Sequence, residues 1–176
     1  FAAASPHAFA ALLNSSIGQA WVWQQSSRHE TRLRFSPSDA LETLPFPNEL
    51  EALEPLGEAY LEARREVMRT DCIGLTKLYN GFHADTERDP RIEGLRVLQR
   101  EMDTAVARAY GWDDLALEHS FHEVPYLPEN DRVRFTISEA ARVEVLRRLS
   151  ELNRQRYEEE VAQGLHRDAE PRTSIR

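Results

Sequence analysis

The feature of this sequence that most constrains its fold is a long apolar stripe with helical spacing in residues 91–113. Apolar side chains recur there every three or four residues, which places them on one face of a helix. The stripe consists of Ile92, Leu95, Leu98, Met102, Ala105, Val106 and Ala109. The other side carries Arg96, Gln99, Arg100, Asp103 and Arg108. These residues predict an amphipathic helix that ends near Gly111 and whose apolar face other helices must cover.

Three further stretches repeat this spacing and predict three more long helices. The first follows Ser5 and covers about residues 6–23, and the second covers about residues 48–69. The third follows Ser138 and continues to about residue 164. A serine directly before each of the first and third stretches is a favourable helix cap, because its hydroxyl accepts a bond from a free backbone N–H.

Two short stretches, residues 31–35 and 132–137, alternate polar and apolar side chains, as half-buried strands do. Residues 115–130 carry few regular signals and two prolines, so this segment is predicted to be mostly loop. Together these patterns predict a mainly α fold, a helical bundle with a few short strands.

Charge and turn residues divide the chain at Pro47. Residues 44–47 contain two prolines, and each proline keeps the residue before it out of the helical conformation. Before this point three arginines and three carboxylates cancel, so the whole net charge of -8 lies after it. We therefore predict one piece at residues 1–47, a helical piece at residues 48–165 and a frayed polar tail at residues 166–176.

The charge division also bears on possible partners. An acidic segment is a poor place to bind a phosphate backbone, because affinity for duplex DNA comes largely from Lys and Arg. The candidate DNA-binding residues are Arg28, Arg32 and Arg34, together with Lys77, the only lysine of the chain. Arg32 and Arg34 would share one face of an edge strand, where they suit phosphates or guanine edges or are simply solvated.

The setting of the protein follows from its apolar runs and its single cysteine. No apolar run approaches the length of a membrane span, so no membrane contact is predicted. Cys72 has no cysteine to pair with, which fits a reducing, cytoplasmic setting, and we predict that it is a small buried side chain. The chain starts at Phe1 and shows no signal peptide, so we interpret it as a fragment of a longer protein.

The residues show no catalytic constellation. His119 and His122 stand three residues apart beside two glutamates. Such residues could supply the ligands of a metal ion, and the protein would then be a metal hydrolase. In a segment predicted to be loop this spacing fixes no geometry, and a hydrogen-bonded loop pair is the favoured interpretation. The sequence also contains neither a glycine-rich phosphate loop nor a nucleophile elbow. No catalytic and no metal-binding residue is therefore predicted.

Five strings of the sequence carry a family resemblance. They are LNSSIGQAW (residues 13–21), SPSDALETLPFP (36–47), LTKLYN (75–80), EMDTAVARAYGWD (101–113) and LSELNRQRYEEE (149–160). In this order they resemble the C-terminal end of large single-chain DNA methyltransferases, the type IIG and MmeI-like restriction-modification enzymes and their relatives in phage defence. The resemblance covers about residues 9–165.

The resemblance implies that residues 1–47 are the α/β end of a target recognition domain and that residues 48–165 are a C-terminal helical domain. In that family the S-adenosylmethionine site and the Asn-Pro-Pro-Tyr type motif lie upstream, and no such motif stands in this sequence. The fragment is thus expected to be non-catalytic and without a cofactor. Its parent would be an S-adenosylmethionine-dependent DNA (adenine) methyltransferase, and its partners would be duplex DNA and the methyltransferase domain of the parent.

A second interpretation belongs to a different class of function. The chain would then be a structural helical module that packs on its parent enzyme, or makes it oligomeric, without touching DNA.

Overall fold

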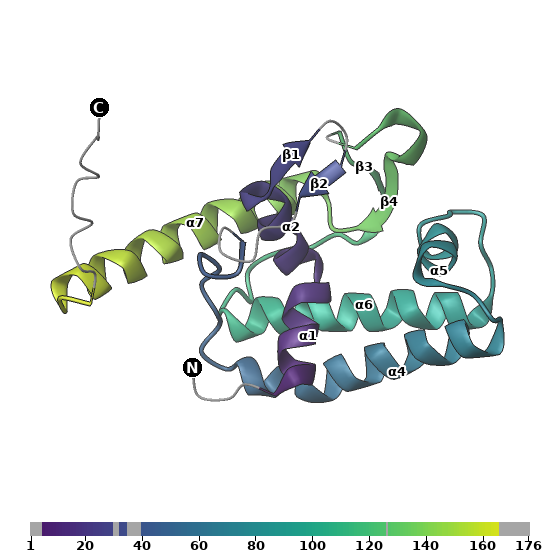
Figure 1. The fold of residues 1–176 in the computed structure, drawn as a ribbon, viewed down its shortest axis with the longest axis horizontal. Coiled ribbons are helices and arrows are strands. Elements are labelled where there is room, and N and C mark those ends of the chain that lie inside the picture. Colours follow the sequence, from purple (N-terminus) through teal and green to yellow (C-terminus); the bar gives the residue numbers. More distant parts are fainter. Residues whose placement is uncertain (1–4, 30–31, 35–39, 126, 166–176) are drawn as a thin grey trace, which may run out of the picture.

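The structure, a computed structural model, describes residues 5–29, 32–34, 40–125 and 127–165, and the predicted mainly α fold is confirmed (Figure 1). In chain order the elements are α1 (Pro6–Asn14), α2 (Ser16–Gln25), β1 (Ser27–His29), β2 (Arg32–Arg34), the 3₁₀ helix η1 (Leu50–Leu53), α4 (Glu54–Thr70), α5 (Leu75–Phe82), α6 (Pro90–Ala109), β3 (Ser120–Glu123), the 3₁₀ helix η2 (Glu129–Asp131), β4 (Val133–Thr136) and α7 (Glu139–Ala162).

The predicted central helix is α6, and the other helices are arranged around it. It begins where the Asp89 carboxylate accepts a bond from the backbone N–H of Arg91 at 2.8 Å, and it ends before Gly111, whose φ is +77°. Figure 1 shows α4 lying alongside α6 in the opposite direction and α1 crossing both helices. The stripe residues Ile92, Leu95, Met102 and Val106 are buried in the shared core, as the sequence predicts.

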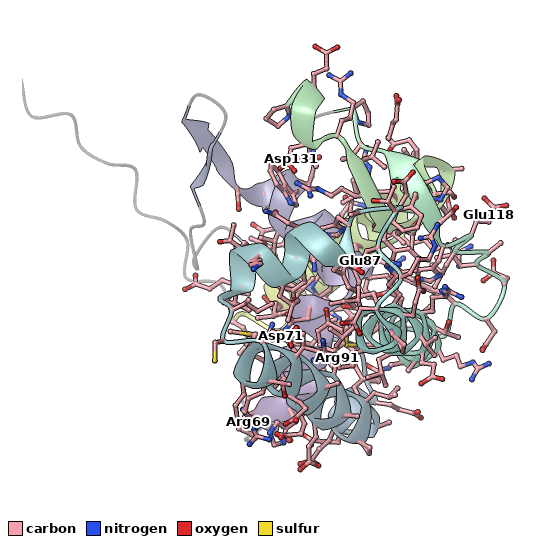
Figure 2. The ribbon with its side chains drawn as sticks, turned by 90° about the vertical axis from the view of Figure 1, so that its right-hand side faces the viewer. Arg69, Asp71, Glu87, Arg91, Glu118 and Asp131 are labelled. Atoms are coloured by element: carbon pink, nitrogen blue, oxygen red, sulfur yellow. The ribbon has the colours of Figure 1, made fainter. Side chains whose placement is uncertain are left out.

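A bidentate ion pair fixes the end of α4 against the start of α6. The Arg91 guanidinium donates to both carboxylate oxygens of Asp71 at 2.8 and 3.0 Å, and Figure 2 shows these two labelled residues next to each other. The neighbouring Cys72 was predicted to be buried, and this prediction is wrong. Cys72 is exposed, with φ +51°, because it belongs to the turn that leaves α4 and faces away from the core.

The single helix predicted for residues 6–23 is divided in two at Ser15. The backbone of Ser15 is extended, and its hydroxyl donates to the Leu12 carbonyl at 2.6 Å and accepts from the Gly18 N–H at 3.0 Å. This bonding ends α1 and caps α2 at the same residue. As a result α1 packs on α4, whereas α2 turns toward α7.

A glycine allows α1 and α4 to approach closely. A Cβ atom at Gly57 of α4 would lie 2.0 Å from the backbone oxygen of His7 in α1, which is far inside contact distance. We expect Gly57→Ala to lower the free energy of unfolding by about 1–3 kcal/mol, since the clash with backbone outweighs the better helix propensity of alanine. Urea unfolding measures this loss.

Gly94 of α6 is the matched control for this substitution. A Cβ atom there would meet no atom within 4 Å, so Gly94→Ala is expected to raise the free energy of unfolding by up to about 1 kcal/mol through helix propensity alone. If Gly57→Ala stabilised the protein as Gly94→Ala does, the close contact between α1 and α4 would be contradicted.

The segment predicted to be loop at residues 115–130 contains a strand, so that prediction is wrong in part. β3 pairs antiparallel with β4, with Phe121 opposite Phe135. The two rings meet edge to face, with their centroids 5.4 Å apart. β4 lies where the strand at residues 132–137 was predicted. The residues of β3, SFHE, do not alternate between polar and apolar as those of a half-buried strand do, so their pattern did not predict a strand.

One hydrophobic core includes residues from both sides of Pro47. Leu12, Ile17 and Trp21 are buried in the same cluster as Leu53 and residues of α6 and α7. The predicted boundary at residue 47 stays a prediction, and the tail at residues 166–176 lies outside the described residues. No helix in the described part of the chain is both long enough and apolar enough to cross a bilayer.

Candidate functional site

Part of the polar side of α6 is buried, whereas Arg100 and Arg108 on the same side are exposed. Arg96 is 1% exposed, Gln99 4% and Asp103 0%. Charged residues are rarely buried to this degree unless other groups bind them, so each must have internal partners. The sequence showed these residues as the polar face of a helix, and nothing in their spacing indicated that they are buried.

Arg96 binds the chain around the end of α5. Its Nε donates to the Phe82 carbonyl at 3.0 Å, and one Nη donates to the Ala84 carbonyl at 2.7 Å. The other Nη contacts the Glu93 carboxylate at 2.5 Å. Further bonds reach the carbonyls of Gly81 and Glu87, and the rings of Phe121 and Phe135 flank the guanidinium. All of these partners belong to the fold, so the role of Arg96 is to hold the turn after α5.

Asp103 joins three segments that are distant in the sequence. One carboxylate oxygen accepts from the backbone N–H of Ser16 at 2.7 Å and from Gln99 Nε2 at 3.1 Å. The other oxygen lies 2.8 Å from His119 Nε2. Asp103 therefore fixes the first turn of α2 and the segment before β3 to α6.

The two histidines considered as metal ligands have separate partners. His119 binds Asp103, and His122 Nε2 lies 2.8 Å from the Glu118 carbonyl oxygen. Within the described ranges, no three His, Cys, Asp or Glu side chains gather as a metal site requires. These contacts agree with the interpretation that both histidines are hydrogen-bonded within the fold. In the described residues no further side chains join them to form the ligand set of a metal hydrolase.

The hydrogen bonds continue from Asp103 to the surface of a cavity. Gln99 Nε2 also donates to the Asn14 carbonyl at 3.1 Å, and the Asn14 side-chain oxygen accepts from Arg64 Nη1 at 3.3 Å. Arg64 Nη1 donates as well to the Tyr79 hydroxyl at 3.2 Å. Tyr79 in turn bonds the hydroxyl of Tyr60, whose pKa is raised well above its usual range, mainly by burial and also by Tyr79. We call these bonds the Asp103–Arg64 network.

The cavity has a volume of about 780 Å³ and lies between α2, α5, the β3–β4 hairpin and the start of α7. Asn14, Arg64, Tyr79 and Gln99 of the Asp103–Arg64 network line one end. The hairpin contributes Arg134 and Asp131, of which the latter is labelled in Figure 2. This volume lies within the range of small-molecule sites, and the mixture of polar and aromatic walls is typical of them. We therefore take the cavity as the candidate functional site.

His83, at the end of α5, lies in the wall of this cavity and is held neutral. Its Nδ1 accepts from the backbone N–H of Phe135 at 3.2 Å. Burial, with further contributions from the guanidinium groups of Arg134 and Arg96, lowers the pKa of His83 from 6.5 to about 3. The unprotonated Nδ1 is thus a structural acceptor that connects α5 to β4.

The depressed pKa of His83 gives a prediction for acid stability. The unfolded chain binds a proton at this residue below pH 6.5 and the folded chain only below about pH 3, so the stabilisation is complete above 6.5 and is lost as the pH falls between these values. We expect a loss of about 1.4 kcal/mol for each pH unit below 6.5. Urea unfolding at pH 7, 6 and 5 measures it, and His83→Gln should flatten this dependence.

The predicted DNA-binding residues lie outside this cavity. Arg28 is in β1 opposite Leu33, and Arg32 and Arg34 are in β2 opposite His29 and Ser27. Their backbone confirms the strand predicted at residues 31–35 for its middle part, whereas their side chains lie outside the described residues. Lys77 is exposed on α5, next to the cavity residue Thr76. The structure does not test whether any of these residues binds DNA.

No family model, no curated protein and no solved structure matches this chain. The resemblance to the C-terminal end of type IIG and MmeI-like methyltransferases therefore stays a prediction. Sequence reasoning missed the buried residues Arg96, Gln99 and Asp103, although Asp103 lies in one of the five strings that carry the resemblance.

Proposed function

We propose that this chain is the non-catalytic C-terminal part of a cytoplasmic DNA methyltransferase of the restriction-modification type, and that it contributes to DNA target recognition and scaffolding. S-adenosylmethionine and the catalytic residues for (adenine) methylation would belong to the parent enzyme. The partners of the chain would be duplex DNA and the methyltransferase domain of the parent. The five strings of the sequence are the source of this proposal.

The observation that carries the DNA-binding part is the hairpin of β1 and β2. Three of its six strand residues are arginine, and Figure 2 shows the hairpin standing out from the helical body. It follows directly after α2, whose first turn is held in the core by Asp103. A projecting arginine-rich strand pair on a rigid support suits contact with phosphates and base edges. The acidic remainder of the chain supports an approach of DNA through this hairpin rather than through the helices.

The test compares duplex DNA binding by the full chain and by Arg28→Ala/Arg32→Ala/Arg34→Ala, measured by fluorescence anisotropy between 50 and 200 mM salt. If three phosphate contacts are lost, the slope of log K against log salt should fall by about 2–3, and affinity at low salt should fall about 10- to 100-fold.

The matched control removes three arginines from exposed ion pairs on the helices. Arg65, Arg69 and Arg154 pair with Glu62, Glu66 and Glu158 on the surfaces of α4 and α7. Replacing all three by alanine gives the same change in net charge, so binding should change only slightly. Equal losses in the two triple variants would exclude the hairpin as the contact surface.

The alternative function, a structural helical module, is favoured by the distal half of α7. Figure 1 shows this half extending away from the body, and the side chains of Tyr157 and Val161 on it are 55% and 48% exposed. They stand four residues apart and so lie on one side of the helix. Absence of DNA binding, together with self-association that Val161→Glu abolishes, would favour this function over the first.

A further inference from the structure

We propose that the cavity binds a nucleotide, with a phosphate at Arg64 and a planar base between the aromatic and amide side chains of the walls. This site is separate from the β1–β2 hairpin, and the inference does not depend on the DNA-binding role proposed for that hairpin.

The first observation is the unneutralised charge of Arg64. Its bonds to Asn14 and Tyr79 both start at Nη1 and both end on neutral oxygens. A guanidinium has five N–H donors, and no carboxylate in the described part of the chain forms an ion pair with Arg64. A partly buried cation without a counter-charge favours an anion beside it.

The second observation is that the other arginines of the cavity already have carboxylate partners. Arg134 pairs with Asp131, and Arg142 pairs with Glu139 at 2.6 Å. Arg64 itself contacts the uncharged side chains of Asn14 and Tyr79, and the lining also includes the uncharged side chains of Gln19, Thr76 and Asn80. Arg64 is therefore the cation of the lining that suits an anionic group, and the remaining charged groups of the lining are Arg134, Arg142 and the carboxylates of Asp131, Glu139 and Glu123.

The third observation is the size and character of the walls. A volume of about 780 Å³ is far more than one phosphate fills, so an anion at Arg64 leaves room for an attached group. Trp23 and Tyr79 contribute aromatic side chains to the lining, while Gln19 and Asn80 contribute amide groups. Aromatic faces and side-chain amides are the groups that stack on and hydrogen-bond a nucleobase.

The fourth observation is that Arg64 is held in place before any ligand arrives. Its partner Asn14 also accepts from Gln99, which in turn bonds the fully buried Asp103. Its other partner Tyr79 bonds Tyr60, which is buried in the core. A cation fixed by such a network loses little conformational freedom when it binds a phosphate.

The nucleotide has two possible sources, a free nucleoside monophosphate or one unit of a single-stranded nucleic acid, and the test separates them. Isothermal titration of the full chain with adenosine 5′-monophosphate and with an eight-residue single-stranded deoxyadenylate covers both. Adenosine without phosphate and inorganic phosphate without a base serve as the ligand controls. We expect one of the two nucleotides to bind more tightly than either control compound.

The variants connect this binding to the cavity. Arg64→Gln should weaken binding about 10- to 100-fold through the lost charge, whereas Arg65→Gln, one residue along and exposed in an ion pair with Glu62, should leave it unchanged. Thr76→Trp adds a ring at an exposed lining position, outside the core, and should block binding without unfolding the protein.

Each outcome decides the proposal. Loss of binding in Arg64→Gln and Thr76→Trp with retention in Arg65→Gln supports it, and the ligand that binds identifies the source. If Arg64→Gln does not fold, Thr76→Trp alone decides. Absence of binding by both nucleotides at millimolar concentration, adenosine binding as tightly as its monophosphate, or binding insensitive to the lining substitutions would overturn it.

Discussion

Replacing Arg96 by methionine is expected to lower the free energy of unfolding by about 3–5 kcal/mol, because a fully buried guanidinium with several acceptors is removed. The carbonyl oxygens of Phe82 and Ala84 lose their charged donor, as do those of Gly81 and Glu87. Methionine keeps most of the apolar stem between the rings of Phe121 and Phe135, so the loss reports mainly on the polar contacts. Urea unfolding at neutral pH measures it.

The control for this prediction lies on the same helix. Arg108 is largely exposed, and its single ion pair with Asp113 spans 3.8 Å. Arg108→Met is therefore expected to change the free energy of unfolding by no more than about 0.5 kcal/mol. If Arg96→Met cost as little as Arg108→Met, the guanidinium would not hold the turn after α5.

The second large effect is expected at Asp103. Asp103→Ala leaves the N–H groups of Ser16 and Gln99, and the ring nitrogen of His119, without their common acceptor in a site closed to solvent. A loss of about 3–4 kcal/mol should follow. Because the asparagine side chain keeps one oxygen for Ser16 and Gln99, Asp103→Asn should cost about 1–2 kcal/mol.

The effect of Asp103 has a structural readout as well. Because Asp103 holds the first turn of α2, hydrogen exchange of the Ser16 and Ile17 amides should become faster in Asp103→Ala than exchange in the middle of α4. The exposed carboxylate Asp113 provides a control, since Asp113→Ala removes the same charge outside the core. Uniform exchange changes across all helices would contradict a local role of Asp103.

The proposed nucleotide site is connected to the buried side chains of Asp103 and Arg96. Asp103 and Gln99 hold Asn14, and Asn14 holds Arg64 at the cavity wall. A variant at Asp103 that still folds is thus expected to weaken nucleotide binding, even though its side chain does not line the cavity. Arg96 binds the turn beyond α5, where Phe82 and His83 line the cavity.

Much of the helical framework follows from local sequence signals. Asp89 and Pro90 start α6, Ser138 caps α7 through the Ala141 N–H at 3.2 Å, and Gly164 ends the last turn with φ +70°. These features depend on residues within one turn of one another, so periodicity and capping rules are sufficient to predict them. The break at Ser15 was missed, because an apolar stripe of helical spacing continues across it and hides the cap.

The candidate site could not be predicted from the sequence, because it is formed by contacts between residues that are distant along the chain. β3 forms only because β4 is available to pair with it, and the cavity exists only where α2, α5, this hairpin and α7 meet. The three arginines of the β1–β2 hairpin and Lys77 were visible in the sequence as candidates, and their role stays a prediction. Arg64 was not visible as a candidate, because a single arginine on a helix has no distinguishing spacing.

The sequence by itself determined where the main helices lie and which apolar side chains form the core, since both depend on the spacing of neighbouring residues along one helix. Only the tertiary structure decided that Arg96 and Asp103 on the polar side of α6 are buried, because their partners are Ser16, His119 and the end of α5. Whether a charged side chain faces water or the interior depends on the elements that the rest of the chain packs against it.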